Sequence, residues 1–389
     1  MAGRGDARRS LAGVALVFLG LGLTSFGGPV AHVGHFRSEL VGKRRWLDEA
    51  GYAGWVALCQ FLPGPSSTQL AFCLGWSRAG WLGGWMAFLA FMAPSGLLMA
   101  ALAWALPRWD GGMADGALRG LQVAAWAVVG HAVQGMARAM GRAWTEWAIA
   151  GLAGLAAWMA PGGHAAQPWI VLAGALAGAL GSRREAWPCW ACEAVQMGRW
   201  QAAACLGMAA CLLAASLAWR GWPGAFYRAG AMVFGGGHVV LPLLEEAVVT
   251  PGLCTRDEFL AGYGAAQAMP GPMFTLAAYL GMRVGGWPGA LAGLAAIFLP
   301  GLLLLSAVAP SWASLARRRW AARAVSGASA AVVGLLGAAW AGVVWPGAIH
   351  GWGDLLPGVA AWMALASGRV SPAWIVVACA GWGWMTGMR

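Results

Sequence analysis

The sequence predicts an all-α, polytopic membrane protein that consists of two homologous repeats with inverted topology and broken helices. Three observations carry this prediction: the composition, the apolar stretches and a set of motifs that occurs twice. Hydrophobic residues make up 60% and charged residues 10% of the 389 residues, whereas soluble domains hold roughly half and a quarter. We therefore expect the chain to cross a lipid bilayer about 10 to 13 times.

The apolar stretches run along the whole chain, and most are long enough to cross roughly 30 Å of hydrocarbon. No small-residue cleavage site follows the first one, so we interpret it as a retained helix and not as a signal peptide. Six stretches lie on each side of a single central one, and an odd number of crossings before the second repeat turns that repeat upside down. The stretches are 11–31, 52–75, 80–106, 118–137, 144–160, 168–182, 200–219, 225–244, 259–280, 285–309, 324–345, 352–367 and 371–388.

The motifs of the first half recur in the same order in the second half. Residues 24–32 and 59–71 read TSFGGPVAH and CQFLPGPSSTQLA, and residues 232–240 and 266–278 read MVFGGGHVV and AQAMPGPMFTLAA. The Phe-Gly-Gly pair is displaced by 208 residues (234−26), the Gln-x-x-Pro-Gly-Pro motif by 207 (267−60) and the next glycine by 206 (281−75). This nearly constant offset predicts a first repeat at 11–182, a linker with an extra transmembrane segment at 183–221 and a second repeat at 222–388.

The net charge of +11 lies in short loops between apolar stretches. We interpret these basic residues as topology signals and expect no nucleic-acid partner. With a cytoplasmic N-terminus, 15 of the 25 basic residues fall on the cytoplasmic side. The cluster of Arg37, Lys43, Arg44 and Arg45 falls on the other side, so either the first stretch does not cross fully or the cluster is functional.

Glycine and proline interrupt the apolar stretches at four places, because glycine is a poor helix former and proline cannot donate to the preceding turn. Proline suits the first position of a helix, so a half-helix is expected to begin at Pro29. The first amides of a half-helix lack intrahelical acceptors and carry the positive end of its dipole. The interrupting residues are Gly27, Gly28, Pro29, Pro63, Gly64, Pro65, Gly235, Gly236, Gly237, Pro270, Gly271 and Pro272.

These half-helix ends have the chemistry of an anion site. A tetrahedral dianion needs many donors and little steric bulk, which helix N-termini provide, so we expect the four ends to converge near the membrane midplane. Close packing or kinking for the breaks, and interhelical hydrogen bonds for the glutamines, are the alternatives. The further candidate ligands beside the breaks are His32, Gln60, Ser66, Thr68, His238, Gln267 and Thr275.

Charged residues near the breaks are few, and charged residues in or beside membrane segments are often functional, so each of them is a candidate. Arg37 and Arg45 are candidates for attracting an oxyanion, since arginine offers several donors to one; the alternative is a solvated loop. Three glutamates are candidates for ion-pair partners of the arginines or for proton carriers: Glu39, Glu245 and Glu246.

The motifs FGGPxAH, Arg45-Trp46-Leu47 and QxxPGP, repeated as FGGGHVVLPLL and QAMPGP, resemble those of the chromate ion transporter superfamily in its long, fused two-domain form. The resemblance covers nearly the whole chain. It implies a secondary transporter that exports chromate across the bacterial inner membrane and gives chromate resistance, with sulfate as a competing analogue. A transporter of sulfate or another oxyanion, and an anion channel, stay open as alternatives.

The sequence contains no pattern of a membrane enzyme. HExxH and paired Asp/His spacings do not occur, and the glycine-rich stretches lack the strand-turn-helix context of a nucleotide site. We therefore expect no catalytic residues, no metal and no cofactor. The partners that we expect are an oxyanion and the lipid bilayer; the coupling ion stays open, and so does the oligomeric state, a homodimer included.

Overall fold

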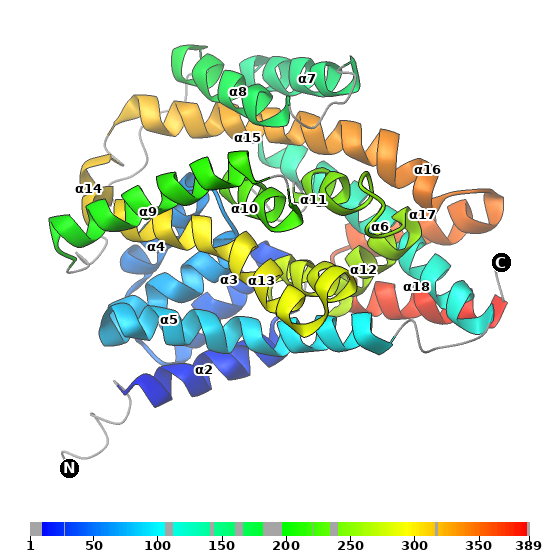
Figure 1. Ribbon diagram of the computed structural model, residues 1–389, viewed down its shortest axis with the longest axis horizontal. Helices are drawn as coiled ribbons and strands as arrows, with labels where there is room; N and C mark the ends of the chain where they lie inside the picture. The colour runs from blue at the N-terminus through cyan, green and yellow to red at the C-terminus, as the bar shows by residue number, and fades with distance from the viewer. Residues whose placement is uncertain are drawn as a thin grey trace.

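The computed structural model of the protein describes residues 10–26, 28–105, 112–140, 144–159, 166–181, 197–219, 221–233, 240–315 and 318–386. These residues form helices and loops and contain no strand, which confirms the predicted all-α class (Figure 1). We call the part from α2 to α8 the first half and the part from α10 to α18 the second half.

The first half contains α2 (Leu11–Thr24), α3 (Gly28–Phe36), the π-helix η1 (Arg37–Lys43), α4 (Glu49–Phe61), α5 (Ser66–Ala105), α6 (Gly112–Ala139), α7 (Trp144–Met159) and α8 (Gln167–Gly181). Helix α9 (Arg199–Ala218) connects the halves. The second half contains α10 (Trp222–Met232), α11 (Val240–Val248), α12 (Arg256–Ala268), η4 (Met273–Thr275), α13 (Leu276–Val308), η5 (Ala309–Ser311), α14 (Trp312–Leu315), α15 (Arg319–Ala339), η6 (Trp340–Val344), α16 (Trp345–Ala348), α17 (Trp352–Ala366) and α18 (Pro372–Thr386).

Four helical stretches among the described residues are long and apolar enough to cross a membrane: Ser66–Ala105, Arg199–Ala218, Met273–Ser311 and Arg319–Ala348. Many other predicted stretches form shorter helices. The stretches at 52–75 and 259–280 are each divided at their Pro-Gly-Pro motif, which confirms broken helices. The number of membrane crossings stays a prediction.

Local capping explains where the helices before these motifs begin. Asp48 accepts a hydrogen bond from the Gly51 amide at 2.8 Å and so caps α4. Thr255 and Glu258 exchange two hydrogen bonds at the start of α12 and form a capping box. The two caps lie at matched positions (255−48=207).

Helices α5 and α13 each fold back on themselves. Their helical conformation is interrupted at Ala79-Gly80 and at Gly285-Gly286, and the second residue of each pair, a glycine, has a positive φ, of 71° and 62°. A Cβ on Gly75 would lie 2.3 Å from the Gly83 carbonyl oxygen. Residues eight apart in a straight helix are roughly 12 Å apart, so the two limbs of α5 form a tight hairpin.

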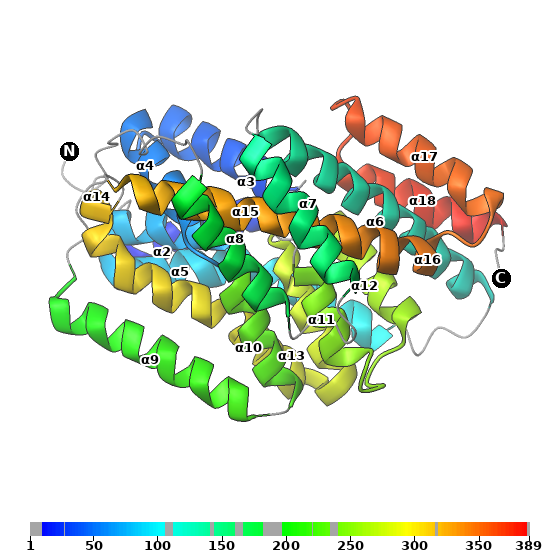
Figure 2. The same ribbon diagram turned by 90° about the horizontal axis from the view of Figure 1, so that it is seen from above.

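The last helices of each half pack against the other half. The pair α7 and α8 packs on α15, and the pair α17 and α18 packs on α6 (Figure 2). A Cβ on Gly327 of α15 would lie 2.1 Å from the Gly174 oxygen of α8, and a Cβ on Gly120 of α6 would lie 2.1 Å from the Cys379 oxygen of α18. The matched residues are 207 (327−120) and 205 (379−174) apart. The contacts therefore recur at nearly the offset of the motifs, while the inversion and the repeat boundaries stay predictions.

Large apolar side chains cover the outside of the helices. Leu152 of α7 is 67% exposed and Leu180 of α8 is 88% exposed. Helix α9 buries only Ala209 and Ser216 among its residues. Apolar faces of this extent are unusual for a soluble protein and are typical of a lipid-facing surface.

Candidate functional site

The first glycine break lies between α2 and α3. Helix α2 ends at Thr24, and α3 begins at Gly28, one residue before the predicted start at Pro29. Gly28 has a φ of 80°, a conformation that glycine adopts without strain. Gly27 lies outside the described residues.

The Pro-Gly-Pro motif of the first half separates α4 from α5. Gly64 has a φ of 124°, and a Cβ there would lie 2.9 Å from the Gly301 Cα of α13. The amides of Thr68 and Gln69 donate to the Pro65 carbonyl oxygen at 3.1 and 3.0 Å. The amides of Ser66 and Ser67 have no acceptor among the described residues, as expected for a helix N-terminus.

The second Pro-Gly-Pro motif, between α12 and η4, has the same construction. Gly271 has a φ of 104°, and a Cβ there would lie 2.9 Å from the Ser95 Cβ of α5. The Thr275 amide donates to the Pro272 carbonyl oxygen at 3.1 Å. Two amides remain without an acceptor in the described part of the chain, those of Met273 and Phe274.

One backbone hydrogen bond joins each Pro-Gly-Pro motif to the other half. The Gly64 amide donates to the Val233 carbonyl oxygen at 2.6 Å, and the Gly271 amide donates to the Ser25 carbonyl oxygen at 2.8 Å. Val233 and Ser25 follow α10 and α2, directly before the glycine breaks, and are themselves 208 residues apart (233−25). Each Pro-Gly-Pro motif therefore meets the helix end that precedes the glycine break of the other half.

Hydrogen bonds to the second limbs of the two long hairpins support these junctions. The Ser95 and Thr275 hydroxyls share a hydrogen bond at 2.6 Å. The Gln69 amide donates to the carbonyl oxygens of Gly301 at 3.1 Å and of Pro63 at 2.9 Å. Ser95 and Gly301 are matched positions (301−95=206), so both junctions are tied to the second limb of the opposite hairpin.

The threonine hydroxyls act within the junctions. Thr68 donates to the Pro65 carbonyl oxygen and Thr275 to the Pro272 carbonyl oxygen, each at 2.8 Å. Both threonines are fully buried. Since these hydroxyl hydrogens are occupied, the threonine hydroxyls are not free to donate to a ligand, whereas the backbone amides named above are.

The remaining candidate ligands differ in their surroundings. His32 is 1% exposed and packs edge-on against Phe91, with ring centroids 5.5 Å apart, close to the Ser25 backbone. Gln267 is buried with its amide against the Met273 sulfur, whereas Gln60 at the matched position is exposed. His238 and the glycines at 235–237 lie outside the described residues.

Two ion pairs connect the half-helices to the helices before the Pro-Gly-Pro motifs. Arg37 binds both carboxylate oxygens of Glu49, at 2.8 and 3.0 Å. Glu245 binds Arg256 at 2.9 Å. The two bridges occupy matched positions with the charges exchanged (245−37=208, 256−49=207), so each of them ties the two elements of its half together.

The other charged candidates lie in η1, directly after η1 and on α11. Glu39 pairs with Lys43 and with Arg44, each at 3.0 Å. A hydrogen bond from Lys43, and a weaker effect of the one from Arg44, lower the pKa of Glu39 below its usual value. The carboxylate is therefore ionised in both ion pairs. Arg45 is exposed with a φ of 51°. Glu246 lines a cavity.

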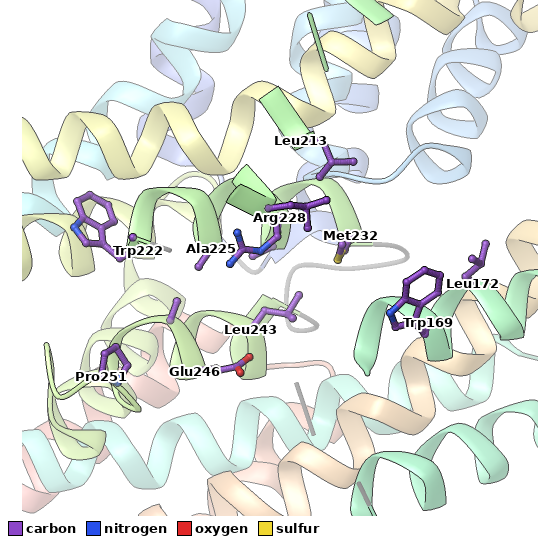
Figure 3. A pocket seen from close by; sticks show the side chains of 14 residues that line it. Trp169, Leu172, Leu213, Trp222, Ala225, Arg228, Met232, Leu243, Glu246 and Pro251 are labelled. Atoms are coloured by element: carbon purple, nitrogen blue, oxygen red, sulfur yellow. The ribbon is translucent and has the colours of Figure 1, made fainter. Parts of the chain in front are cut away.

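This open cavity of about 570 Å³ is lined by residues of α8, α9, α10 and α11. Its walls are mostly apolar, but Arg228 of α10 and Glu246 of α11 point into it (Figure 3). Met232, at the end of α10, places the cavity beside the second glycine break. Arg228 was not selected from the sequence; the signal that indicates it is a basic residue inside the apolar stretch 225–244.

An all-α membrane protein whose broken helices meet across two similar halves has the architecture of a secondary transporter. The family model described as "Chromate transporter" matches residues 12–179 and 222–384. The chain belongs to this family, and it is a multi-pass membrane protein.

Curated relatives match most of the chain. A probable chromate transport protein of Synechococcus elongatus is 29% identical over 334 residues, which are 85% of this chain and 84% of the relative. The chromate transport protein of Cupriavidus metallidurans is 31% identical and covers 83% of this chain and 80% of its own length. The one of Pseudomonas aeruginosa is 31% identical with coverages of 82% and 78%. No solved structure matches the chain.

Proposed function

We propose that the protein is a secondary transporter that carries chromate out of the bacterial cytoplasm across the inner membrane and so confers chromate resistance. Chromate as the substrate is supported by the names of the relatives, which are chromate transport proteins. The observation that carries the site is the pair of hydrogen bonds from Gly64 to Val233 and from Gly271 to Ser25, since these bonds bring the helix breaks of both halves together.

The proposed binding groups are backbone amides at the helix starts. Those of Ser66, Ser67, Met273 and Phe274 have no acceptor among the described residues. Amides at a helix N-terminus, together with the helix dipole, bind oxyanions without a basic side chain. The glycines at 64 and 271 let the opposite half approach these helix starts closely, because a side chain there would overlap with Gly301 or Ser95.

The proposal includes an arrangement of the chain and a competing substrate. The repeats at 11–182 and 222–388 would be related by an axis in the membrane plane, with 183–221 as the linker. Sulfate has the same tetrahedral shape and charge as chromate and would compete for the same amides.

The proposed direction follows from electrostatics. An inside-negative potential drives a dianion outward with about 2.3 kcal/mol per charge per 100 mV, which is roughly 4.6 kcal/mol for two charges. Efflux of chromate therefore has a driving force without any further coupling.

The test is a counterflow assay with radiolabelled chromate on purified protein in proteoliposomes. We expect saturable exchange of labelled for unlabelled chromate and inhibition by sulfate. Flux that does not saturate and shows no counterflow would indicate an anion channel. Exchange of sulfate that chromate does not inhibit would assign another oxyanion as the substrate.

A further inference from the structure

Two polar side chains are buried without partners where the first glycine break meets the second Pro-Gly-Pro motif. Ser25 and His32 are each 1% exposed. The Ser25 hydroxyl and both ring nitrogens of His32 have no hydrogen-bond partner among the described residues. The Ser25 carbonyl oxygen accepts the Gly271 amide and lies beside the His32 ring. We call this contact of Ser25 with Gly271 the first junction.

The equivalent contact in the other half, that of Val233 with Gly64, is the second junction. Valine occupies the matched positions there, since Val233 corresponds to Ser25 (233−25=208) and Val240 to His32 (240−32=208). The same backbone contact therefore forms with a serine at one junction and a valine at the other. A buried polar group without a partner lowers the stability of a fold, so the packing of the junction does not explain the serine and the histidine.

A glutamine at the second junction has its donor satisfied. A Cβ on Gly64 would lie 2.7 Å from the Gln69 Nε2. This amide nitrogen donates to the carbonyl oxygens of Pro63 and Gly301. The Gln69 Oε1 has no partner in the described part of the chain, but a carbonyl oxygen is an acceptor and offers nothing to an anion. Among the described side chains of the two junctions, the unpartnered donors are therefore those of the first.

The first junction also lies next to backbone donors of the proposed site. Gly271 is followed, after one proline, by Met273 and Phe274, whose amides have no acceptor among the described residues. The His32 ring packs edge-on against Phe91, and a Cβ on Gly271 would lie 3.6 Å from the Phe91 carbonyl oxygen. A hydroxyl and an imidazole each offer a hydrogen, and hydrogen bonds to a charged acceptor are stronger than those to a neutral one.

We propose that the Ser25 hydroxyl and the His32 imidazole are side-chain donors of the oxyanion site, in addition to the backbone amides. An oxyanion at the first junction satisfies both groups at once, so its binding offsets the cost of burying them. Since both are buried and α3 packs on α5, the oxyanion reaches them when these two helices separate, as alternating access requires. This inference rests on the proposed transport function.

The test measures two quantities for each purified protein in detergent. One is the dissociation constant for radiolabelled chromate and for radiolabelled sulfate, and the other is the thermal unfolding midpoint without either oxyanion. A side chain that supports the fold through partners of its own lowers the midpoint when it is removed. An unpartnered donor that serves the substrate changes the dissociation constant instead.

We expect Ser25→Ala and His32→Leu each to weaken the binding of both oxyanions by roughly 10- to 100-fold, because each removes a hydrogen bond to a charged group. Their unfolding midpoints without oxyanion should equal or exceed that of the wild type, because each substitution removes an unsatisfied buried group. Ser25→Thr and His32→Gln keep a donor and should retain most of the affinity.

His35 provides the matched control on the same helix. It lies three residues after His32, but its Nε2 shares a hydrogen bond with the Thr24 hydroxyl at 3.2 Å. Leu243 occupies the matched position in the second half (243−35=208). We expect His35→Leu to lower the unfolding midpoint and to keep the wild-type dissociation constants. A loss of affinity as large as that of His32→Leu would attribute the effect to a displaced α3 and would contradict the assignment.

Two further results would overturn the proposal: wild-type affinity in both Ser25→Ala and His32→Leu, or lower unfolding midpoints of these variants without oxyanion. If the wild type binds and transports chromate in that case, the proposed function stands and only the assignment of the two donors fails. A wild type that binds neither oxyanion contradicts the proposed function itself.

Discussion

Three glycines at the helix breaks combine a positive φ with different surroundings. Gly64 and Gly271, with φ values of 124° and 104°, approach the chain of the opposite half, whereas nothing lies within 4 Å of the Cβ position of Gly28. A non-glycine residue at positive φ costs roughly 1–2 kcal/mol from backbone strain alone. Steric overlap adds to this cost only where the Cβ meets other atoms.

This difference predicts unequal effects of one substitution. Gly28→Ala should lower the stability by about 1–2 kcal/mol and leave the protein folded. Gly64→Ala and Gly271→Ala should unfold the protein or lower its stability by more than Gly28→Ala does, because the Cβ would overlap with Gly301 or Ser95. Thermal unfolding of the detergent-solubilised variants measures the order. Equal unfolding midpoints for all three variants would contradict this prediction, because they would show that the junctions move apart to accommodate the added Cβ.

The two matched threonines also differ in one contact. Thr275→Val removes hydrogen bonds to Pro272 and Ser95 and leaves the Ser95 hydroxyl without this partner, whereas Thr68→Val removes one to Pro65. A buried hydrogen bond contributes about 1 kcal/mol and an unsatisfied buried group costs about 1–3. We therefore expect the larger loss of stability for Thr275→Val. The double variant Ser95→Ala/Thr275→Val should recover part of it in the same assay.

At the scale of the elements, the sequence located the breaks but not their partners. Glycine and proline act on their own turn of the chain, so the division of 52–75 and 259–280 followed from local chemistry. The pairing of Gly64 with Val233 joins residues far apart in the sequence, and no local pattern indicates it. Gln60 and Gln267 share one motif, yet only Gln267 is buried, because burial depends on the neighbouring helices.

The exchanged ion pairs provide an element-scale prediction. The double variant Arg37→Glu/Glu49→Arg gives the first half the charge arrangement of Glu245 and Arg256 and should restore the bridge. If Arg37 only ties the start of η1 to α4, the double variant should transport chromate at the wild-type rate, while each single variant is impaired. The measurement is initial uptake into proteoliposomes.

A role in attracting the anion has a different signature. Exposed charges act over about 8 Å at physiological ionic strength, so a steering defect shrinks when inert salt is added. Arg45→Gln should show such a salt-dependent defect if Arg45 attracts chromate. A defect of the Arg37/Glu49 double variant that persists in high salt would contradict a purely structural bridge.

At the scale of the whole molecule, the two halves exchange their last helix pairs. The repeated motifs predicted two related halves, but they contain no information about which half covers which helix. The close contacts of Gly120 with Cys379 and of Gly174 with Gly327 decide this, and glycine is so common in the chain that no single one is distinguished in the sequence.

The exchange predicts the behaviour of a divided chain. Fragments 1–196 and 197–389, produced together, should associate and transport chromate, because α7 and α8 bind α15 while α17 and α18 bind α6. Either fragment alone should aggregate or be degraded. Affinity purification through a tag on one fragment, followed by the uptake assay, tests this. Stable, monodisperse fragments on their own would contradict the interlocked packing.

The exchanged helix pairs also set an order of events during biosynthesis. Helices α7 and α8 leave the ribosome well before α15, which begins 138 residues after the end of α8 (319−181). At 5–20 residues per second this interval is on the order of ten seconds. During that time the glycine faces of α7 and α8 meet lipid or the insertion machinery instead of their final partner. Maturation therefore ends only after the C-terminal helices have entered the membrane, and a stalled ribosome leaves the earlier helices as substrates for quality control.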